Sequence, residues 1–215
     1  MRAAHRYALL VLAVLSAVVF MALAEKAQDQ AEARRWFDID LTVKSVVQSH
    51  RVPALESPMR LFSYLGSGYV LVPLNLGVWL FLLRARRLRL AIFVPVITAG
   101  SVVIEGLTKW IVARPRPRLT GYGFPSGHVL VSVVFYGTVI YLFWLLARQS
   151  LWRWVGTGVC VFVIMGIAYS RLYLNAHWLT DVVGAFAAGT TYLAFALLWI
   201  AGRPCQQPSP RRIPP

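Results

Sequence analysis

The sequence predicts an all-α, polytopic membrane protein: a bundle of six transmembrane helices with an extracytoplasmic amphipathic segment. Of its 215 residues, 58% are hydrophobic, whereas a soluble globular domain is usually about 45–50% apolar. The apolar residues gather into six runs, each close to the roughly 17–25 residues that a helix needs to cross the hydrocarbon core of a bilayer. These runs cover residues 7–24, 61–83, 90–107, 129–146, 151–169 and 182–201.

The first run has a second interpretation as a secretory signal peptide. Arg2 and Arg6 precede it, and Ala22-Leu23-Ala24 is similar to a signal-peptidase site. Its 18 apolar residues exceed the roughly 7–15 of a typical signal-peptide core. This length favours a retained transmembrane helix.

The distribution of arginine predicts the orientation of the bundle. Six of the cations lie in residues 25–60, where six acids balance them, and five more lie in or beside the motifs described below. The remaining eleven are accompanied by no acid: Arg2, Arg6, Arg84, Arg86, Arg87, Arg89, Arg148, Arg153, Arg203, Arg211 and Arg212. The positive-inside rule places these, and both termini, in the cytoplasm, as in a bacterial inner (plasma) membrane.

The net charge of +14 is expected from loops that contact anionic membrane lipids, so we predict no nucleic-acid partner. Cys160 lies in an apolar run and Cys205 in the tail, which predicts neither a disulfide framework nor a cysteine metal site.

Residues 1–201 are predicted to form one domain, followed by a disordered, proline-rich cytoplasmic tail at 202–215. Within the domain, residues 25–60 form an extracytoplasmic loop. Apolar and charged residues alternate between Trp36 and Val47, which favours an amphipathic helix near the lipid headgroups. A solvated connector is the alternative.

The first of three polar motifs follows the third apolar run. Lys109 closes the run, and Arg116 stands seven residues later in Arg114-Pro115-Arg116-Pro117-Arg118. Two prolines prevent the helix from continuing, so the cations are presented from a stiff loop that suits a phosphate. A basic cluster that touches lipid headgroups is the alternative, and we leave Arg114 and Arg118 with that interpretation.

The second motif, Pro125-Ser126-Gly127-His128, directly precedes the fourth run. Ser126 is a plausible N-cap, and Gly127 lets the backbone approach a ligand, so free N–H groups and the positive end of the helix dipole would face an anion. His128 would stand beside that anion as a proton donor. For these four residues alone, the alternative is an ordinary helix cap followed by an interfacial histidine.

The third motif joins the fifth and sixth runs. Ser170 and Arg171 end one helix, His177 opens the next, and Asp181 lies four residues further on, on the same helix face as His177. An acid there can hold one ring nitrogen and leave the other free to attack. A surface ion pair is the alternative. Glu105, one turn before Lys109 inside an apolar run, is expected to pair with Lys109 or Arg116.

In this order and at these intervals, the three motifs resemble the signature of the type 2 phosphatidic acid phosphatase superfamily, closely over residues 109–181. The resemblance implies that His177 attacks phosphorus and forms a phosphohistidine. It implies that Asp181 orients His177, and that His128 protonates the leaving oxygen and later activates water. The groups that would hold the phosphoryl oxygens are Lys109, Arg116, Ser126, Gly127 and Arg171. Ser170, which belongs to the signature, would support them, as would Glu105, which does not belong to it.

The resemblance also implies an integral membrane enzyme that needs no metal or other cofactor. Three cations with helix-end N–H groups can stabilise the equatorial oxygens of a phosphoryl group in transfer. The implied substrate is a lipid phosphate or diphosphate: polyprenyl diphosphate, phosphatidylglycerol phosphate or phosphatidic acid. The alternatives are a lipid phosphotransferase with the same intermediate and a non-catalytic lipid-phosphate binding or transport protein. A neutral His177 acting with an acidic His128 predicts a bell-shaped pH–rate profile.

Overall fold

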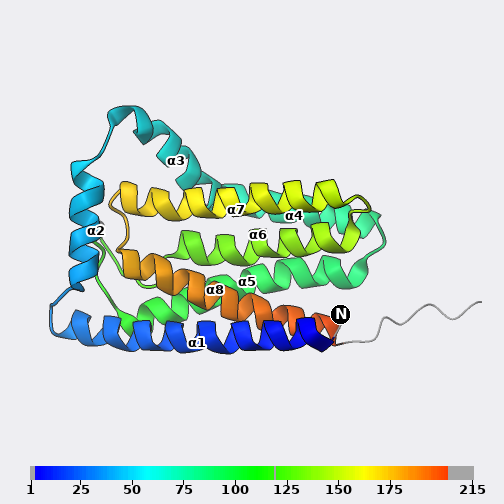
Figure 1. The fold of residues 1–215 in the computed structure, drawn as a ribbon, viewed down its shortest axis with the longest axis horizontal. Coiled ribbons are helices and arrows are strands. Elements are labelled where there is room, and N and C mark those ends of the chain that lie inside the picture. The colour runs from blue at the N-terminus through cyan, green and yellow to red at the C-terminus, as the bar shows by residue number, and fades with distance from the viewer. Residues whose placement is uncertain (1–2, 119, 203–215) are drawn as a thin grey trace, which may run out of the picture.

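The computed structural model describes residues 3–118 and 120–202, and its regular elements in these ranges are all helical (Figure 1). The predicted disordered tail lies outside them from residue 203 onward. In chain order the helices are α1 (Ala3–Glu32), α2 (Asp38–Ser49), the short 3-10 helix η1 (Pro53–Leu55), α3 (Glu56–Leu65), α4 (Gly68–Arg84), α5 (Leu88–Val112), α6 (Gly127–Leu146), α7 (Ser150–Tyr173) and α8 (Leu179–Ala201).

Helix α6 forms the centre of the bundle. It carries no Asp, Glu, Lys or Arg, and a helix that is apolar on all sides is expected to be enclosed by others. It packs against α5, α7 and α8, and its buried residues form the main apolar core with those of α7 and α8. The outer helices expose large apolar side chains instead, as expected where the surrounding solvent is lipid.

Within the described residues, five helices are long and apolar enough to span a membrane: α1, α5, α6, α7 and α8. A bent pair, in which the segment Pro53–Leu65 and helix α4 meet at 48°, passes the same test when its two parts are taken together as one span, which brings the candidate spans to as many as six. The all-α polytopic class is therefore confirmed, but the expectation of one continuous helix over residues 61–83 was wrong. The chain breaks at Gly66 and Ser67, where glycine is a poor helix former and the Ser67 hydroxyl donates to the Tyr64 carbonyl oxygen at 2.6 Å.

The amphipathic helix predicted between residues 25 and 60 is α2, which lies across one end of the bundle (Figure 1). It packs against α7 and α8. Gln48 Nε2 donates to the carbonyl oxygens of Leu172 and Tyr173, both at 3.2 Å. The alternative of a solvated connector was therefore wrong. Helix α1 also extends eight residues beyond its predicted end and packs along α8.

The three motifs meet at the end of the bundle that α2 covers. Helix α5 ends there, α6 begins there, α7 ends there and α8 begins there (Figure 1). The short connections at residues 85–87 and 147–149 lie at the opposite end. Segments distant in the sequence are thus assembled into one site.

Candidate active site

The first motif leaves α5 through a rigid loop. Ala113 adopts a left-handed conformation with φ of 48° at the C-cap of α5, and the prolines that follow keep the chain extended. Arg116 Nε donates to the Tyr122 carbonyl oxygen at 2.9 Å, which fixes its half-buried side chain. Lys109 forms the expected ion pair with Glu105. Lys109 is therefore held within α5, and Arg116 within the loop that follows it.

The second motif begins α6. Ser126 is the N-cap residue, but its hydroxyl makes no capping hydrogen bond. Its N–H instead donates to the Asp181 carbonyl oxygen at 3.1 Å, which ties the start of α6 to α8. Among the described residues, the buried Oγ of Ser126 has no hydrogen-bond partner. A buried hydroxyl beside the free N–H groups of a helix start suits an anion.

The third motif lies in the turn between α7 and α8 and at the start of α8. His177 Nδ1 donates to Asp181 Oδ2 at 3.2 Å, and the Trp178 N–H donates to the same oxygen at 3.1 Å. His177 is 4% exposed and Asp181 is fully buried. Asp181 therefore selects the tautomer of His177 that leaves Nε2 unprotonated, which is the state required of a nucleophile.

The pKa of His177 is lowered from its ordinary value, chiefly because burial disfavours the charged imidazolium. The hydrogen bond and negative charge of Asp181 oppose this shift, while the positive charges of Arg171 and Arg116 reinforce it. The imidazole of His177 is thus kept neutral to a more acidic pH than that of an ordinary histidine.

Arg171, at the end of α7, is 7% exposed. Its Nη1 donates to the hydroxyl of Ser63 on α3 at 2.5 Å, and its buried Nε has no partner among the described residues. The contribution of Ser63 has no signal in the sequence. Ser170, by contrast, donates to the Ile167 carbonyl oxygen at 2.7 Å inside its own helix, so its hydroxyl supports α7 rather than joining the other motif residues.

Arg114 does not contact lipid headgroups, contrary to the interpretation taken from the sequence. Its side chain is fully buried between two carboxylates, with Nη1 donating to Asp181 Oδ1 at 2.9 Å and Nη2 to Asp40 Oδ2 at 2.6 Å. Asp40, on α2, is 1% exposed, and the sequence offered no reason to single it out. Arg118 remains exposed.

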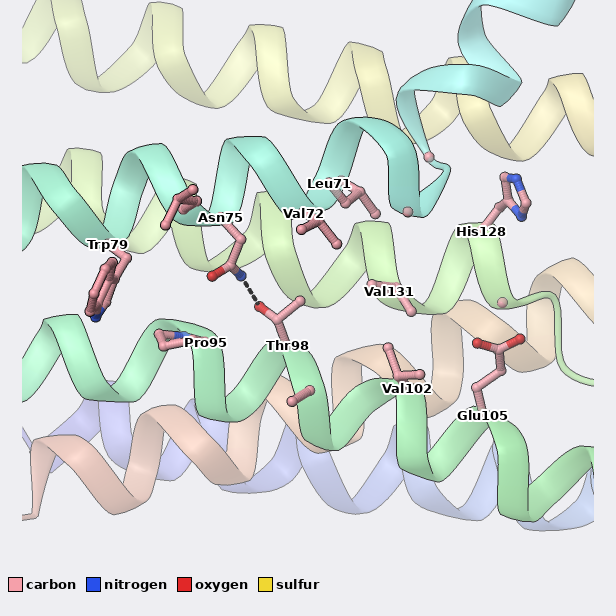
Figure 2. Close-up of a pocket in the computed structure, with 15 residues that line it drawn as sticks. Leu71, Val72, Asn75, Trp79, Pro95, Thr98, Val102, Glu105, His128 and Val131 are labelled. Atoms are coloured by element: carbon pink, nitrogen blue, oxygen red, sulfur yellow. Dashed lines mark hydrogen bonds between the residues drawn. The ribbon is translucent and has the colours of Figure 1, made fainter.

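An apolar groove of about 790 Å³ opens onto this site between α4, α5 and α6. His128 and Glu105 lie at one end, and Trp79 lies toward the other (Figure 2). Between them the lining is mainly aliphatic, with Asn75 and Thr98 as polar members: the Asn75 side-chain amide donates to the Thr98 hydroxyl at 2.8 Å. On α5 the groove extends from Pro95 to Glu105, or about 15 Å at the helical rise of 1.5 Å per residue.

Comparison with known families agrees with this geometry, because the model of the PAP2 superfamily matches residues 90–205. The chain belongs to the PAP2 superfamily. It is an integral membrane phosphatase, a hydrolase of phosphate esters. The match includes all three motifs and excludes α1, α2, α3 and α4.

Named relatives in this superfamily include an undecaprenyl-diphosphatase of Sulfolobus acidocaldarius, which is 26% identical over 72% of this chain and 74% of its own length. Phosphatidylglycerophosphatase B of Bacillus subtilis is 29% identical over 65% of this chain and 72% of its own. Among solved structures, the PAP2-type phosphatidylglycerolphosphate phosphatase of Bacillus subtilis superposes with a TM-score of 0.80 at 20% identity, covering 91% of this chain and 98% of that one. LpxE of Aquifex aeolicus superposes with a TM-score of 0.59 at 23% identity, covering 75% and 96%. Both structures share the fold.

Gly127 provides a test of the candidate phosphate site. A Cβ at this position would overlap the Glu105 carboxylate, so we expect Gly127→Ala to displace Glu105, disturb its ion pair with Lys109 and lower kcat/KM by about 10²-fold. Phosphate release by the purified variant measures the effect. Gly158→Ala on α7 is the control, because nothing lies within 4 Å of its added Cβ. Activity of Gly127→Ala within twofold of that control would contradict close packing at the phosphate site.

Proposed function

We propose that this phosphatase removes a phosphate from a lipid phosphate or diphosphate, without a metal ion, at the outer face of the membrane and through a phosphohistidine. The observation that supports this most directly is the apolar groove opening beside His128 and Glu105. A groove between membrane-spanning helices receives an acyl or prenyl chain from the bilayer, while the cations at its mouth hold the phosphate.

In the first step, His177 Nε2 attacks phosphorus and the bond to the leaving oxygen breaks. His128 gives its proton to that oxygen, so the lipid departs as an alcohol or, from a diphosphate, as a monophosphate. Asp181 stabilises the positive charge on the phosphorylated His177 ring. In the second step His128 takes a proton from water, the water oxygen attacks phosphorus, and the bond between nitrogen and phosphorus breaks to release inorganic phosphate.

The phosphoryl oxygens are held by cations and N–H groups in place of a metal ion. Arg116 and Arg171 both act electrostatically on His177, and Lys109 acts on His128, so all three positive charges are felt at the two histidines. The Ser126 hydroxyl and the first N–H groups of α6 complete the donor set. Such preorganised donors stabilise charge on the equatorial oxygens of a phosphoryl group during transfer.

Polyprenyl diphosphate, phosphatidylglycerol phosphate and phosphatidic acid are the proposed substrate class. The names of relatives include an undecaprenyl-diphosphatase and a phosphatidylglycerophosphatase, which supports the first two. The arginine distribution supports cytoplasmic termini in a bacterial inner membrane. Because the catalytic end is opposite the start of α1 and the end of α8 (Figure 1), the site then faces outward.

A panel of these three lipids in detergent micelles tests the proposal, with phosphate release as the readout. We expect turnover of at least one lipid in EDTA, inhibition by vanadate, which adopts the five-coordinate geometry of phosphorus in transfer, and much lower kcat/KM for a water-soluble alkyl phosphate that cannot fill the groove. Loss of activity in EDTA with rescue by Mg²⁺ would contradict the metal-free clamp. Transfer of phosphate to an added acceptor lipid, with no release, would instead identify a phosphotransferase.

A further inference from the structure

We propose that Arg114 and Asp40 are positioning residues of the reaction: Arg114 holds the carboxylate of Asp181 in place, and Asp40 supplies the second negative charge that keeps Asp181 effective on His177. This inference rests on the proposed role of His177 as nucleophile. It assigns helix α2, outside the region that matches the superfamily model, a direct connection to the reacting histidine.

The hydrogen bonds of Asp181 show how its orientation is set. Oδ2 accepts from His177 Nδ1 and from the Trp178 N–H, while Oδ1 accepts from Arg114 Nη1. Both oxygens are occupied, so the carboxylate cannot rotate without breaking a contact on each side. The ring of His177 is therefore oriented through Asp181 by Arg114, although Arg114 touches neither His177 nor the phosphate pocket by any hydrogen bond among the described residues.

A single cation beside Asp181 would weaken the support that Asp181 gives to His177. When His177 is phosphorylated its ring becomes positively charged, and the carboxylate stabilises that charge only to the extent that Arg114 does not cancel it. Asp40 removes the conflict, because one guanidinium lies between two carboxylates. The group of three then carries a net charge of minus one next to the nucleophile.

The buried surroundings of Arg114 strengthen the interactions between these charges. Its guanidinium lies over the rings of Phe37, Trp36 and Trp178, at 5.1, 5.8 and 5.8 Å from their centroids. The side chains of Arg114, Asp40 and Asp181 have no exposed area. In a site that excludes water, charges interact with little screening, and an unpaired one is costly.

Thr180 joins the group through its backbone and its side chain. Its N–H donates to Asp40 Oδ1 at 2.9 Å, and its hydroxyl donates to Asp40 Oδ2 at 2.6 Å and accepts from Arg114 Nη1 at 2.6 Å. Asp40 thus contacts the first turn of α8, one residue before Asp181. Asp40 is therefore joined to the catalytic end of the protein by hydrogen bonds to Thr180 as well as by its ion pair with Arg114.

Removal of the Asp40 charge has a defined effect on the pH dependence. His177 acts as a neutral base, so kcat/KM falls as pH drops through its pKa. A less negative environment lowers that pKa, which moves the acid limb of the profile to lower pH. Charged or titratable groups approach His177 or its partner His128 from each neighbouring element: Asp40 and Lys44 from α2, Glu105 and Lys109 from α5, Arg114 and Arg116 from the following loop, His128 from α6, Arg171 from α7 and Asp181 from α8.

The test compares Asp40→Asn with Asp38→Asn, which removes the same charge from an exposed position one half-turn earlier on α2. With one lipid substrate for all variants, ionisation of the substrate cancels from the comparison. For Asp40→Asn we expect kcat to fall about 10- to 100-fold with KM changed less than about threefold, and the acid limb to move down by about 0.5–1 pH unit. Asp38→Asn should match the parent protein in kcat, in KM and in the position of the acid limb.

Asp40→Glu separates charge from packing, because it keeps the charge and disturbs the fit. If the acid limb of Asp40→Glu lies at the same pH as that of the parent protein, the proposal is supported, even if kcat falls. An acid limb that moves down in Asp40→Glu, or stays unchanged in a folded Asp40→Asn, would overturn it. If Asp40→Asn does not fold, Asp40→Ser takes its place as the variant that lacks the charge, with the same expected shift of the acid limb. Failure of the parent protein to form a phosphohistidine would contradict the proposed function instead, so the two failures remain distinguishable.

Discussion

His177→Asn is expected to lower kcat on any lipid phosphate by about 10⁴-fold or more, because His177 is the proposed nucleophile and Asn cannot take over that role. The amide nitrogen of Asn can still donate to Asp181, so the buried site keeps its packing and one hydrogen bond while losing Nε2. Phosphate release measures the loss. Rapid quenching of the parent protein should also yield a phosphorylated residue that is stable to alkali and labile to acid, as a phosphohistidine is.

The matched control for this experiment is His50→Asn, at the C-cap of α2, where an exposed histidine lies at the same end of the molecule. Its activity should equal that of the parent protein. A His177→Asn variant that retains more than about one hundredth of the activity would rule out the phosphohistidine mechanism, since water activated by His128 would then suffice.

His128→Asn has the second largest expected effect, and its size should depend on the leaving group. The leaving group of phosphatidic acid is an alkoxide, which must be protonated as the bond to phosphorus breaks, so we expect the rate on this substrate to fall about 10²- to 10⁴-fold. The phenolate of an aryl phosphate and the monophosphate of a diphosphate are better leaving groups, so the first step should be less impaired with those substrates. The second step still needs His128 to activate water, and the phosphohistidine should accumulate.

The measurement is the fraction of enzyme that carries labelled phosphate after mixing with a labelled diphosphate. We expect a high fraction in His128→Asn and a low one in the parent protein. An equal loss of rate for all leaving groups, with no accumulated phosphoenzyme, would mean that His128 holds the phosphate and does not transfer protons.

The sequence predicted the parts of the molecule that depend on local composition and on spacing within one segment. Apolar runs long enough to span a bilayer identified the helices, and the interval between His177 and Asp181 placed both on one face, where the structure shows them in contact. The ion pair between Glu105 and Lys109 was predictable for the same reason. The catalytic roles of these residues remain predictions.

What the sequence could not predict depends on packing between distant segments. Arg114 was interpreted as a lipid contact because it stands among other cations, yet its partner Asp40 lies 74 positions away. Ser63, which binds Arg171, lies 108 positions from it. The break at Gly66 and Ser67 could not be predicted, because an apolar run shows composition and not the direction of the helix axis. Each of these features requires the arrangement of several helices to be known.

The placement of Asp40 on α2 has a consequence for how the protein can be divided. The region that matches the superfamily model, residues 90–205, contains the three motifs and Arg114 but not α2. A polypeptide cut to that region would keep a buried guanidinium and lose one of its two carboxylates. Since removing one partner of a buried ion pair typically costs about 3–5 kcal/mol, we expect residues 90–205 to be less stable without the N-terminal helices than with them.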